Sequence, residues 1–398
     1  MRTFSASWIF PITSPPIKNG SITVDDNGKI VEIGTTNGNK SEGQTTNSDG
    51  IIVPGFINAH CHLELSHMKG QVREGQGMAG FISELVPKRN KFPEEEIKKA
   101  AADAETEMMG NGIVAVGDIS NTDHSFGQKA KANLHYHTFI EVFDIDPTKA
   151  RSEFEKGITL QAKIKGHTSS IVPHAPYTVS PELHDLIGEI KQEITCIHNQ
   201  ESKAENELFV KKSGALQELF HGLGFDLDWI EATGKNSIRS SLPHLLRNKR
   251  VQLVHNTFTS KKDIAWAQSF MSVPVPGNEQ LQLYWCTCPN ANLYIENKLP
   301  DYDIFMIANA KMTLGTDSYA SNWSLSIFEE IKTIHKHFPH IPLEKLFTWA
   351  TYNGAEFLGI EKKFGSLEKG RSPGLVLVKN CDVENSRLQE NSTVERLV

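Results

Sequence analysis

The chain has 398 residues, of which 38% are hydrophobic and 22% are charged. This composition is that of a globular protein with a sizeable core, in one large domain or two smaller ones. The formal net charge is −7, with acidic and basic residues interspersed, which argues against a nucleic-acid partner.

The N-terminal segment MRTFSASWIFPITSPPIKNG contains a short apolar patch that Pro11, Pro15 and Pro16 interrupt. A signal peptide needs a continuous apolar region, and a membrane span needs about 20 apolar residues. The segment fits neither. The five cysteines are sparse and odd in number, which indicates reduced thiols. We therefore expect a cytoplasmic protein with no membrane partner and no disulfide.

The predicted elements begin with a strand-rich segment, residues 1–54, which contains the turn sequence DDNGKIVEIG. From Ile51 onward, β-branched runs alternate with amphipathic or charged segments, a pattern typical of parallel βα units. The predicted strands are residues 51–60, 112–120, 134–143, 169–176, 193–200, 250–257, 281–289 and 311–318. Eight such strands predict a closed (β/α)8 barrel, the TIM barrel.

Two of the connecting helices have readable ends. Residues 92–110 open with a run of glutamates and stop at a Gly-Asn-Gly sequence, while residues 180–191 open with Ser-Pro. Near the C-terminus, GSLEKGRSPGLVLVKN is again strand-rich. We predict that residues 1–54 and 362–398 pair as one small discontinuous β-sandwich domain, and that the barrel spans residues 55–361.

His60 and His62 stand two residues apart at the end of the first barrel strand, in PGFINAHCHLELSH. Residues i and i+2 of a strand share one face, so both imidazoles would point into the barrel while Cys61 points outward. Two such imidazoles can chelate one ion. The spacing alone is weak support, because the chain has 16 histidines and two further pairs of this kind.

Those two pairs are predicted to be structural. His135 and His137 stand at the start of their strand, whereas active sites of barrels form at the C-terminal ends of the strands. His335 and His337 lie on a predicted helix, where residues i and i+2 diverge by about 200° and cannot share an ion.

Residues that can bind a metal or transfer a proton end four later strands. They are His174, His198 with Glu201 three positions on, His255, and Asp317. Because all of these strand ends would meet at one rim, we expect the side chains to converge there. Three imidazoles and one carboxylate suit Zn²⁺ or Fe²⁺ with a position left open for water, whose pKa falls to about 7 on such an ion. No lysine stands at the fourth strand to bridge a second metal, so we predict a single divalent ion.

An ordered set of motifs resembles the amidohydrolase superfamily, within it the cytosine-deaminase-like and chlorohydrolase-like branch. The motifs are PGFINAHCH, PHAPYTVSPEL, HNQES, LVHN, CPNANLY, GTDSYASN and the closing GSLEKG, and they span nearly the whole chain. The resemblance implies a (β/α)8 barrel with a small β-sandwich domain. It also implies one metal ion, held by the residues that match the family's ligands: His60, His62, His198 and Asp317.

The resemblance also implies roles for the remaining residues. A metal-bound hydroxide attacks the ring carbon that carries an amino group, and Asp317 and His255 orient it and take its proton. Glu201 matches the glutamate that protonates the adjacent ring nitrogen, after which ammonia leaves. His174 matches a histidine that hydrogen-bonds the substrate, although it could also merely close its strand.

The substrate is suggested by two further motifs. HCHLELS and GMAGFISELVPKR resemble aminodeoxyfutalosine deaminases of the menaquinone pathway. This similarity favours a 6-aminopurine nucleoside, with aminodeoxyfutalosine as the leading candidate. Glu64 could hydrogen-bond the ribose or purine, or could instead pair with Lys69 or Arg73 to close a loop. A benzoate-bearing substrate would need a cation, and the sequence does not rank Lys69, Arg73 and Arg89.

Three classes of function remain. The first is a metal-dependent deaminase whose partner is a small heterocyclic substrate. The second is another hydrolase on the same site, which opens a cyclic amide or displaces chloride from a heterocycle. The third is a non-enzymatic barrel scaffold, and the retention of every metal ligand together with Glu201 argues against it. A homodimer is compatible with each class.

Overall fold

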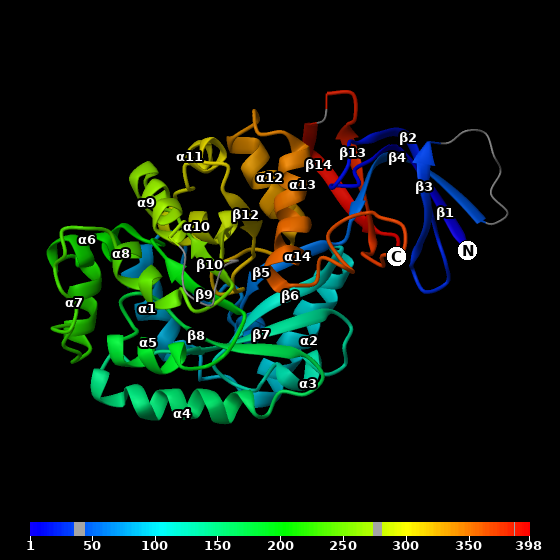
Figure 1. Ribbon diagram of the computed structural model, residues 1–398. Helices are drawn as coiled ribbons and strands as arrows, with labels where there is room; N and C mark the ends of the chain where they lie inside the picture. Colours follow the sequence, from blue (N-terminus) through cyan, green and yellow to red (C-terminus); the bar gives the residue numbers. More distant parts are fainter. Residues whose placement is uncertain (36–43, 274–280, 386) are drawn as a thin grey trace. The chain divides into compact units, whose positions relative to one another are not determined.

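The structure is a computed structural model that describes residues 1–35, 44–273, 281–385 and 387–398 (Figure 1). These residues form two compact units. One consists of Met1–Ala59, Glu105–Val116 and Ser326–Val398, and the other of His60–Ala104 and Gly117–Leu325. The boundaries at residues 54 and 362 stay a prediction.

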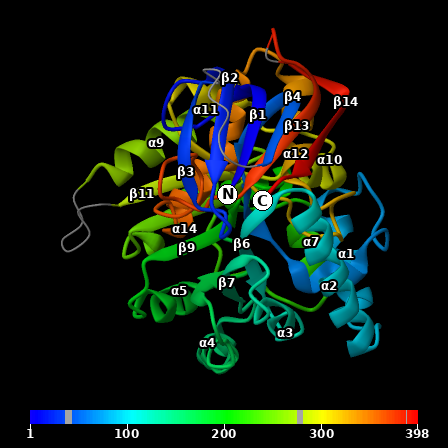
Figure 2. The ribbon, with the colours of Figure 1, turned by 90° about the vertical axis from the view of Figure 1, so that its right-hand side faces the viewer.

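The first unit contains a six-stranded sheet built from both ends of the chain, as the sequence predicts (Figure 2). In sheet order its strands are β14 (Arg387–Arg396), β13 (Leu375–Asp382), β4 (Gln44–Pro54), β1 (Arg2–Ile9), β2 (Ile17–Val24) and β3 (Ile30–Thr35). Only the β1–β4 pair among these neighbours is parallel. Ile22 and Val24 alternate with polar neighbours along β2 and pack with Ile9, Ile52 and Leu377 into one apolar cluster, which stabilises this face.

The same unit also contains three helices near the C-terminus. They are α12 (Ile327–His337), α13 (Leu343–Ala350) and α14 (Tyr352–Leu358). Ser326 caps α12 by accepting a hydrogen bond from the Glu329 backbone N–H, and acidic side chains follow in the first turn, where they interact favourably with the helix dipole.

The (β/α)8 barrel is confirmed. Two four-stranded sheets supply its eight strands (Figure 1): β5 (Phe56–Cys61), β6 (Ile113–Ser120), β7 (His135–Val142) and β8 (Thr168–Pro173), then β9 (Ile194–Asn199), β10 (Arg250–His255), β11 (Gln282–Thr287) and β12 (Lys311–Leu314). The sheets join where the His198 N–H donates to the His174 carbonyl at 2.9 Å. A parallel bridge between Cys61 and Asp317 joins the other two edges.

The first predicted strand, residues 51–60, is wrong as a single strand. Ile51 and Pro54 belong to β4 of the six-stranded sheet, and the barrel strand begins only at Phe56. Pro54 has no N–H to donate, and Gly55 lies outside both strands. The Pro-Gly pair therefore separates two strands that read as one apolar run.

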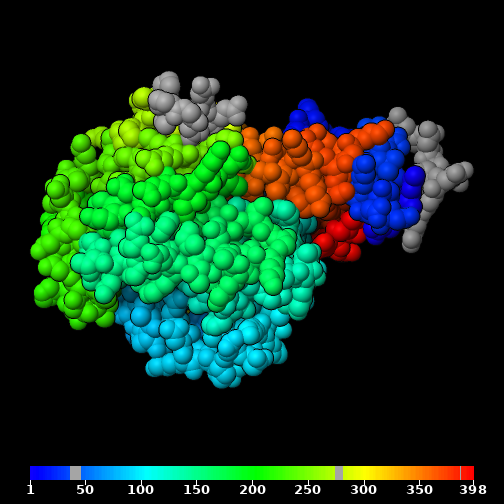
Figure 3. All heavy atoms as spheres, turned by 60° about the horizontal axis from the view of Figure 1, so that its bottom comes forward, coloured from blue at the N-terminus to red at the C-terminus, as the bar shows by residue number. Residues whose placement is uncertain are grey.

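Helices follow the barrel strands, as expected of βα units. They are η1 (Leu63–Met68), α1 (Gly77–Lys88), α2 (Glu94–Gly110), α3 (Phe126–Lys129), η2 (Pro147–Lys149), α4 (Ala150–Gln161), α5 (Pro181–Gly188), α6 (Lys203–Lys211), α7 (Ala215–Gly222), α8 (Ile238–Ser241), η3 (Leu242–Leu245), α9 (Lys261–Met271), α10 (Pro289–Glu296) and α11 (Tyr302–Ile307). In Figure 3 the segment containing α1, drawn in light blue, lies on the outer surface. Across the described ranges no helix has both the length and the apolar character that a membrane crossing requires.

Candidate active site

Four side chains converge at the C-terminal ends of the strands. His60 and His62 come from the end of β5, His198 from β9, and Asp317 from the segment after β12. One ligand atom from each residue lies within 4.8 Å of those from the other three, and all four residues are buried. The structure thus brings together the four residues predicted to hold a metal.

The spacing of these atoms fits a small divalent cation. His60 Nε2 lies 3.2 Å from His62 Nε2, and Asp317 Oδ1 lies 3.5 Å and 3.3 Å from these two nitrogens. Tetrahedral ligands bound at about 2.1 Å stand roughly 3.4 Å from one another. Three nitrogen and oxygen atoms at this spacing are therefore compatible with simultaneous ligation of one ion.

Burial also sets the protonation states that a metal needs. It lowers the pKa of His60 and lowers that of His62 well below the ordinary value. Burial by itself would raise the pKa of Asp317, but the hydrogen bond to His60 and the nearby His62 and His255 outweigh it, and the pKa lies below its ordinary value. Neutral imidazoles beside an ionised carboxylate are the forms that ligate.

A hydrogen bond fixes the orientation of the His198 ring. Its Nδ1–H donates to the His174 carbonyl oxygen at 2.8 Å, which leaves Nε2 to face the ligand cluster. Burial lowers the pKa of His198 to about 4. A backbone carbonyl that accepts from one ring nitrogen is a common device for orienting a metal-binding histidine.

The backbone at two site residues is in the left-handed region. His255 has φ of 73° and Asp317 has φ of 57°, a conformation that is costly for residues other than glycine. The Asp317 N–H donates to the His60 carbonyl, and Ser321 Oγ donates to Asp317 Oδ2. His255 Nδ1 pairs with Asn292 Oδ1 at 2.9 Å. These bonds hold both side chains at the rim despite the unfavourable backbone.

Glu201 and His255 form an acid and base pair beside the cluster. Glu201 Oε1 lies 3.4 Å from His255 Nε2, and both side chains are buried. Burial raises the pKa of Glu201 well above its ordinary value, and the charge of Asp317 adds to this. Burial lowers the pKa of His255 to about 4. Burial therefore favours the protonated form of the Glu201 carboxyl and the neutral form of the His255 imidazole, the pair of forms that proton transfer requires.

The turn after β9 positions Glu201. Glu205 accepts hydrogen bonds from the backbone N–H groups of Gln200 and Glu201, at 2.8 and 3.1 Å, and from Ser237 Oγ at 2.5 Å. Glu205 is buried and lies in the first turn of α6. This second carboxylate fixes the main chain from which Glu201 projects.

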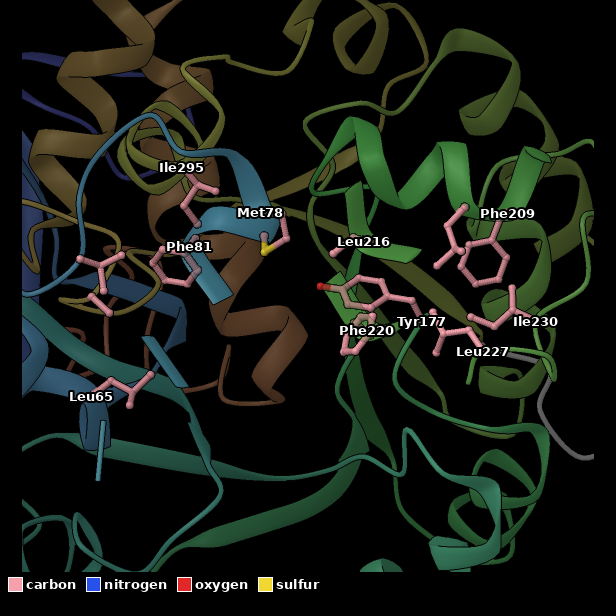
Figure 4. Close-up of a cluster of buried hydrophobic side chains, with 14 of the residues drawn as sticks. Leu65, Met78, Phe81, Tyr177, Phe209, Leu216, Phe220, Leu227, Ile230 and Ile295 are labelled. Carbon is pink, nitrogen blue, oxygen red and sulfur yellow. The ribbon is translucent and has the colours of Figure 1, made fainter. Parts of the chain in front are cut away.

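A pocket of about 910 Å³, including its open mouth, contains the site. His62, His198, Asp317, Glu201, His255 and His174 all line it. Its outer wall is apolar: Figure 4 shows Met78 and Phe81 of α1 facing Tyr177 and Phe220. His174 Nδ1 pairs with Thr178 Oγ1 at 2.7 Å, and burial lowers the pKa of His174 to about 4. Polar groups at the base and apolar walls above suit a flat heterocycle with an apolar arm.

Glu64 lies outside the pocket lining. It is 3% exposed, and its oxygens accept from the Asn121 N–H at 3.1 Å, the Thr122 N–H at 2.8 Å and Thr122 Oγ1 at 2.6 Å. Arg89 lies 3.7 Å away. The carboxylate therefore ties the segment after β5 to the loop after β6, and its binding to substrate stays a prediction.

The other two basic residues near this motif have partners elsewhere. Lys69 Nζ sits 4.0 Å from the centroid of the Tyr319 ring, and Arg73 Nε lies 2.5 Å from Glu84 Oε1. A loop-closing pair of Glu64 with Lys69 or Arg73, the alternative drawn from sequence, stays a prediction.

The two histidine pairs predicted to be structural lie outside the ligand cluster. His137 makes hydrogen-bonding contacts with Thr168 Oγ1 and Ser170 Oγ, at 2.8 and 3.0 Å, inside the sheet. His335 lies on α12 and accepts from the Leu388 N–H at 3.3 Å.

The sequence-based reasoning missed Glu141. This residue is the seventh of the eight residues of β7, is 6% exposed and lines the pocket. Its Oε2 accepts from Asn121 Nδ2 at 3.1 Å. The signal was a carboxylate inside the apolar run FIEVF near a strand end, where a buried charge calls for an explanation.

The chain matches the model of the amidohydrolase family over residues 51–395. The 5-methylthioadenosine/S-adenosylhomocysteine deaminase of Moorella thermoacetica is 24% identical, with 97% of this chain and 87% of that protein covered. The 5'-deoxyadenosine deaminase of Methanosarcina acetivorans is 23% identical, with coverages of 91% and 80%.

Solved structures show the same fold. The aminofutalosine deaminase of Helicobacter pylori in complex with methylthio-coformycin aligns with a TM-score of 0.77 at 20% identity, over 95% of this chain and 92% of that one. The zinc complex of an atrazine chlorohydrolase from Arthrobacter aurescens TC1 aligns with a TM-score of 0.72 at 17% identity, over 94% and 86%.

Proposed function

Because the chain belongs to the amidohydrolase family, we propose that it is a metal-dependent deaminase that hydrolyses the 6-amino group of an adenine nucleoside. The observation that carries this proposal is the buried pair of Glu201 and His255 beside the metal-ligand cluster. The curated relatives, whose names are those of adenine nucleoside deaminases, support the substrate class.

The residues of the chain divide the work. A divalent ion held by His60, His62, His198 and Asp317 would supply an activated water at neutral pH. The neutral His255 accepts a proton through Nε2, and the protonated Glu201 donates one to the ring nitrogen next to the reacting carbon. Both transfers keep charge from accumulating in the heterocycle, and a further proton makes ammonia the leaving group.

We propose one ion, zinc, with ferrous iron as the alternative. A second possible ligand group consists of Glu141, His174 and His198. This group shares His198 with the four-residue cluster. The His198 nitrogen that lies near Glu141 is Nδ1, and it already donates its proton to the His174 carbonyl. A protonated nitrogen cannot ligate, so the donor set supports a single site. Elemental analysis of the purified protein tests both the stoichiometry and the metal.

Among the described residues that line the pocket, Arg89 is the sole Lys or Arg. Its side chain is 23% exposed, whereas that of Arg73 is 74% exposed and paired with Glu84. This ranks Arg89 first as the partner of an anionic substrate group. A carboxylate on an apolar arm that lies along α1 would reach it. We therefore propose aminodeoxyfutalosine as the specific substrate. We also propose that the enzyme is cytoplasmic, and its site is compatible with a homodimer.

The experiment is an ammonia-release assay across 6-aminopurine nucleosides, including aminodeoxyfutalosine, with purine absorbance followed in parallel. Deamination releases one molecule of ammonia for each molecule of nucleoside whose conversion the purine absorbance reports. Ring opening without ammonia, or chloride release from a chlorinated heterocycle, would favour the other hydrolases of this family. Absence of turnover after zinc or ferrous iron is supplied would contradict the proposal.

Arg89 is tested separately with Arg89→Gln. We expect kcat/KM for aminodeoxyfutalosine to fall by about 10- to 100-fold because a charge-assisted contact is lost, while adenosine, which has no carboxylate, is affected far less. Arg73→Gln is the matched control. Equal losses on both nucleosides would contradict the role of Arg89.

A further inference from the structure

We propose that Glu141 binds a sugar hydroxyl of the nucleoside and so discriminates ribonucleosides from nucleosides that lack these hydroxyls. The inference rests on the proposed function and adds to it a residue that selects the sugar. It starts from a buried carboxylate oxygen that has no hydrogen-bond partner within the part of the chain that the structure describes, on a residue that lines the pocket.

Oε1 of Glu141 is that oxygen. The side chain is 94% buried, since its exposed fraction is 6%. Among the described residues its nearest basic atom is His198 Nδ1 at 3.4 Å, but the Nδ1 proton is directed to the His174 carbonyl at 2.8 Å. Leaving a buried carboxylate oxygen unpaired is unfavourable, because the oxygen has lost its hydrogen bonds to water. A donor from a bound ligand would recover this free energy.

Asn121 fixes the direction of the carboxylate. Its Nδ2 donates both to Glu141 Oε2 at 3.1 Å and to the Glu141 carbonyl at 3.0 Å, and its backbone N–H is held by Glu64. The Glu141 side chain is therefore held by the loop after β6, with Oε2 occupied and Oε1 available. A group oriented before binding loses little conformational entropy when a ligand arrives.

The chemistry of a 6-aminopurine nucleoside identifies the donor. Its ring nitrogens accept hydrogen bonds, so its donors are the 6-amino group and the sugar hydroxyls. The 6-amino group must lie at the metal-ligand cluster, between Glu201 and His255, for deamination to occur. The hydroxyls are the donors that remain for Glu141. A hydroxyl both donates and accepts, so the pairing holds for either protonation state of the carboxyl.

Glu64, the carboxylate that the sequence places next to the metal motif, is less suited to this role. Its two oxygens already accept from the Asn121 and Thr122 backbone and from Thr122 Oγ1. It also lies outside the pocket lining. Through Asn121 the two carboxylates are mechanically linked, with Glu64 bracing the loop and Glu141 facing the cavity.

The test compares adenosine with 2',3'-dideoxyadenosine on Glu141→Leu and on Glu141→Gln, whose amide can pair with both Asn121 and a hydroxyl. We expect Glu141→Leu to lower kcat/KM for adenosine by about 10- to 100-fold and Glu141→Gln to lower it less. The value for the dideoxy analogue should change less than threefold, with metal content retained in both variants. Glu193→Gln is the matched control, because Glu193 pairs with Lys249 outside the pocket lining, and its ratio of the two substrates should equal that of the wild type.

Two results would overturn the assignment. Equal losses on both nucleosides, or loss of the metal, would mean that Glu141 acts only by positioning His198. Failure of the proposed function gives a different result, because wild-type protein would then release no ammonia from any nucleoside. The hydroxyl contact can still be tested in that case with the products inosine and 2',3'-dideoxyinosine. The measurement is the difference between the thermal shifts that the two products give, compared between wild type and Glu141→Leu. Equal differences would reject the contact.

Discussion

At the scale of single residues, burial decides the chemistry of this site. Removal of water disfavours the charged form of both groups, so burial raises the pKa of the Glu201 carboxyl and lowers that of the His255 imidazole. On a surface, the Glu201 carboxyl would instead be ionised at neutral pH. The proposed activity thus depends on the exclusion of water from Glu201 and His255 as well as on the identity of these residues.

The first prediction separates proton transfer from metal binding. Glu201→Gln keeps the four ligands and cannot donate the proton, so we expect full metal content and a loss of kcat of about 10²- to 10⁴-fold. His198→Ala removes a ligand, so we expect both metal and activity to be lost. Elemental analysis and ammonia release measure the two effects. A Glu201→Gln protein with normal turnover would contradict the assigned proton donor.

The residues of the site were predictable to different degrees. The four candidate ligand residues lie at strand ends on one rim, so the pattern of strand ends in the sequence predicted that their side chains would converge. Glu141 lies within a strand rather than after it, and its importance depends on which neighbours leave Oε1 unpaired. Likewise, Lys69, Arg73 and Arg89 differ only in their three-dimensional partners, which no spacing in the sequence encodes.

At the scale of elements, the turn from β9 into α6 contains a buried carboxyl that titrates near neutral pH. Glu205 accepts two backbone N–H groups and a hydroxyl, yet burial raises its pKa to about 7. It supports the main chain of Glu201 without lining the pocket. The protonation of Glu205 therefore affects both the free energy of unfolding and the turn from which Glu201 projects.

The second prediction follows from this pKa. An acid whose pKa is higher in the folded than in the unfolded state keeps more protons when folded, so stability falls as pH rises between the two values. We expect the Glu205 contribution to the free energy of unfolding to decrease by on the order of 3 kcal/mol from about pH 4.5 to about pH 7. Urea unfolding across this range measures it. Glu205→Gln should remove that part of the slope, and an unchanged slope would contradict it.

The strands were predictable because β-branched runs and their turn signals recur along the chain. The exception was the run from Ile51, where the buried end of β4 leads directly into the buried strand β5, so hydrophobicity continues through the break. The boundary between the two strands lies at Pro54 and Gly55. A Pro-Gly pair within an apolar run therefore predicts a break between two strands, even where the hydrophobicity is continuous.

At the scale of the whole molecule, the ligand cluster links segments that are distant in sequence. His60 and Asp317 are separated by more than half of the chain, and the bridge between Cys61 and Asp317 closes the barrel at the same place. An ion bound there would therefore stabilise the native state, because the unfolded chain lacks the assembled site.

The third prediction concerns removal of this ion. We expect a chelator to lower the unfolding temperature by on the order of 5 °C or more, and added zinc to restore it, as measured by calorimetry. His198→Ala is the control, because it should already unfold near the temperature of the chelated wild type and respond little to chelator. A wild-type protein that contains metal and shows no shift would contradict a stabilising ion.

The left-handed backbone at His255 means that catalysis and heat resistance pull this position in opposite directions. Glycine relieves such a conformation, and His255 is not one of the four candidate ligands, so a library screened only for survival at high temperature should accumulate inactive proteins altered at His255. An engineer who wants a hardier enzyme should leave the rim alone and look for gains in the surface helices instead.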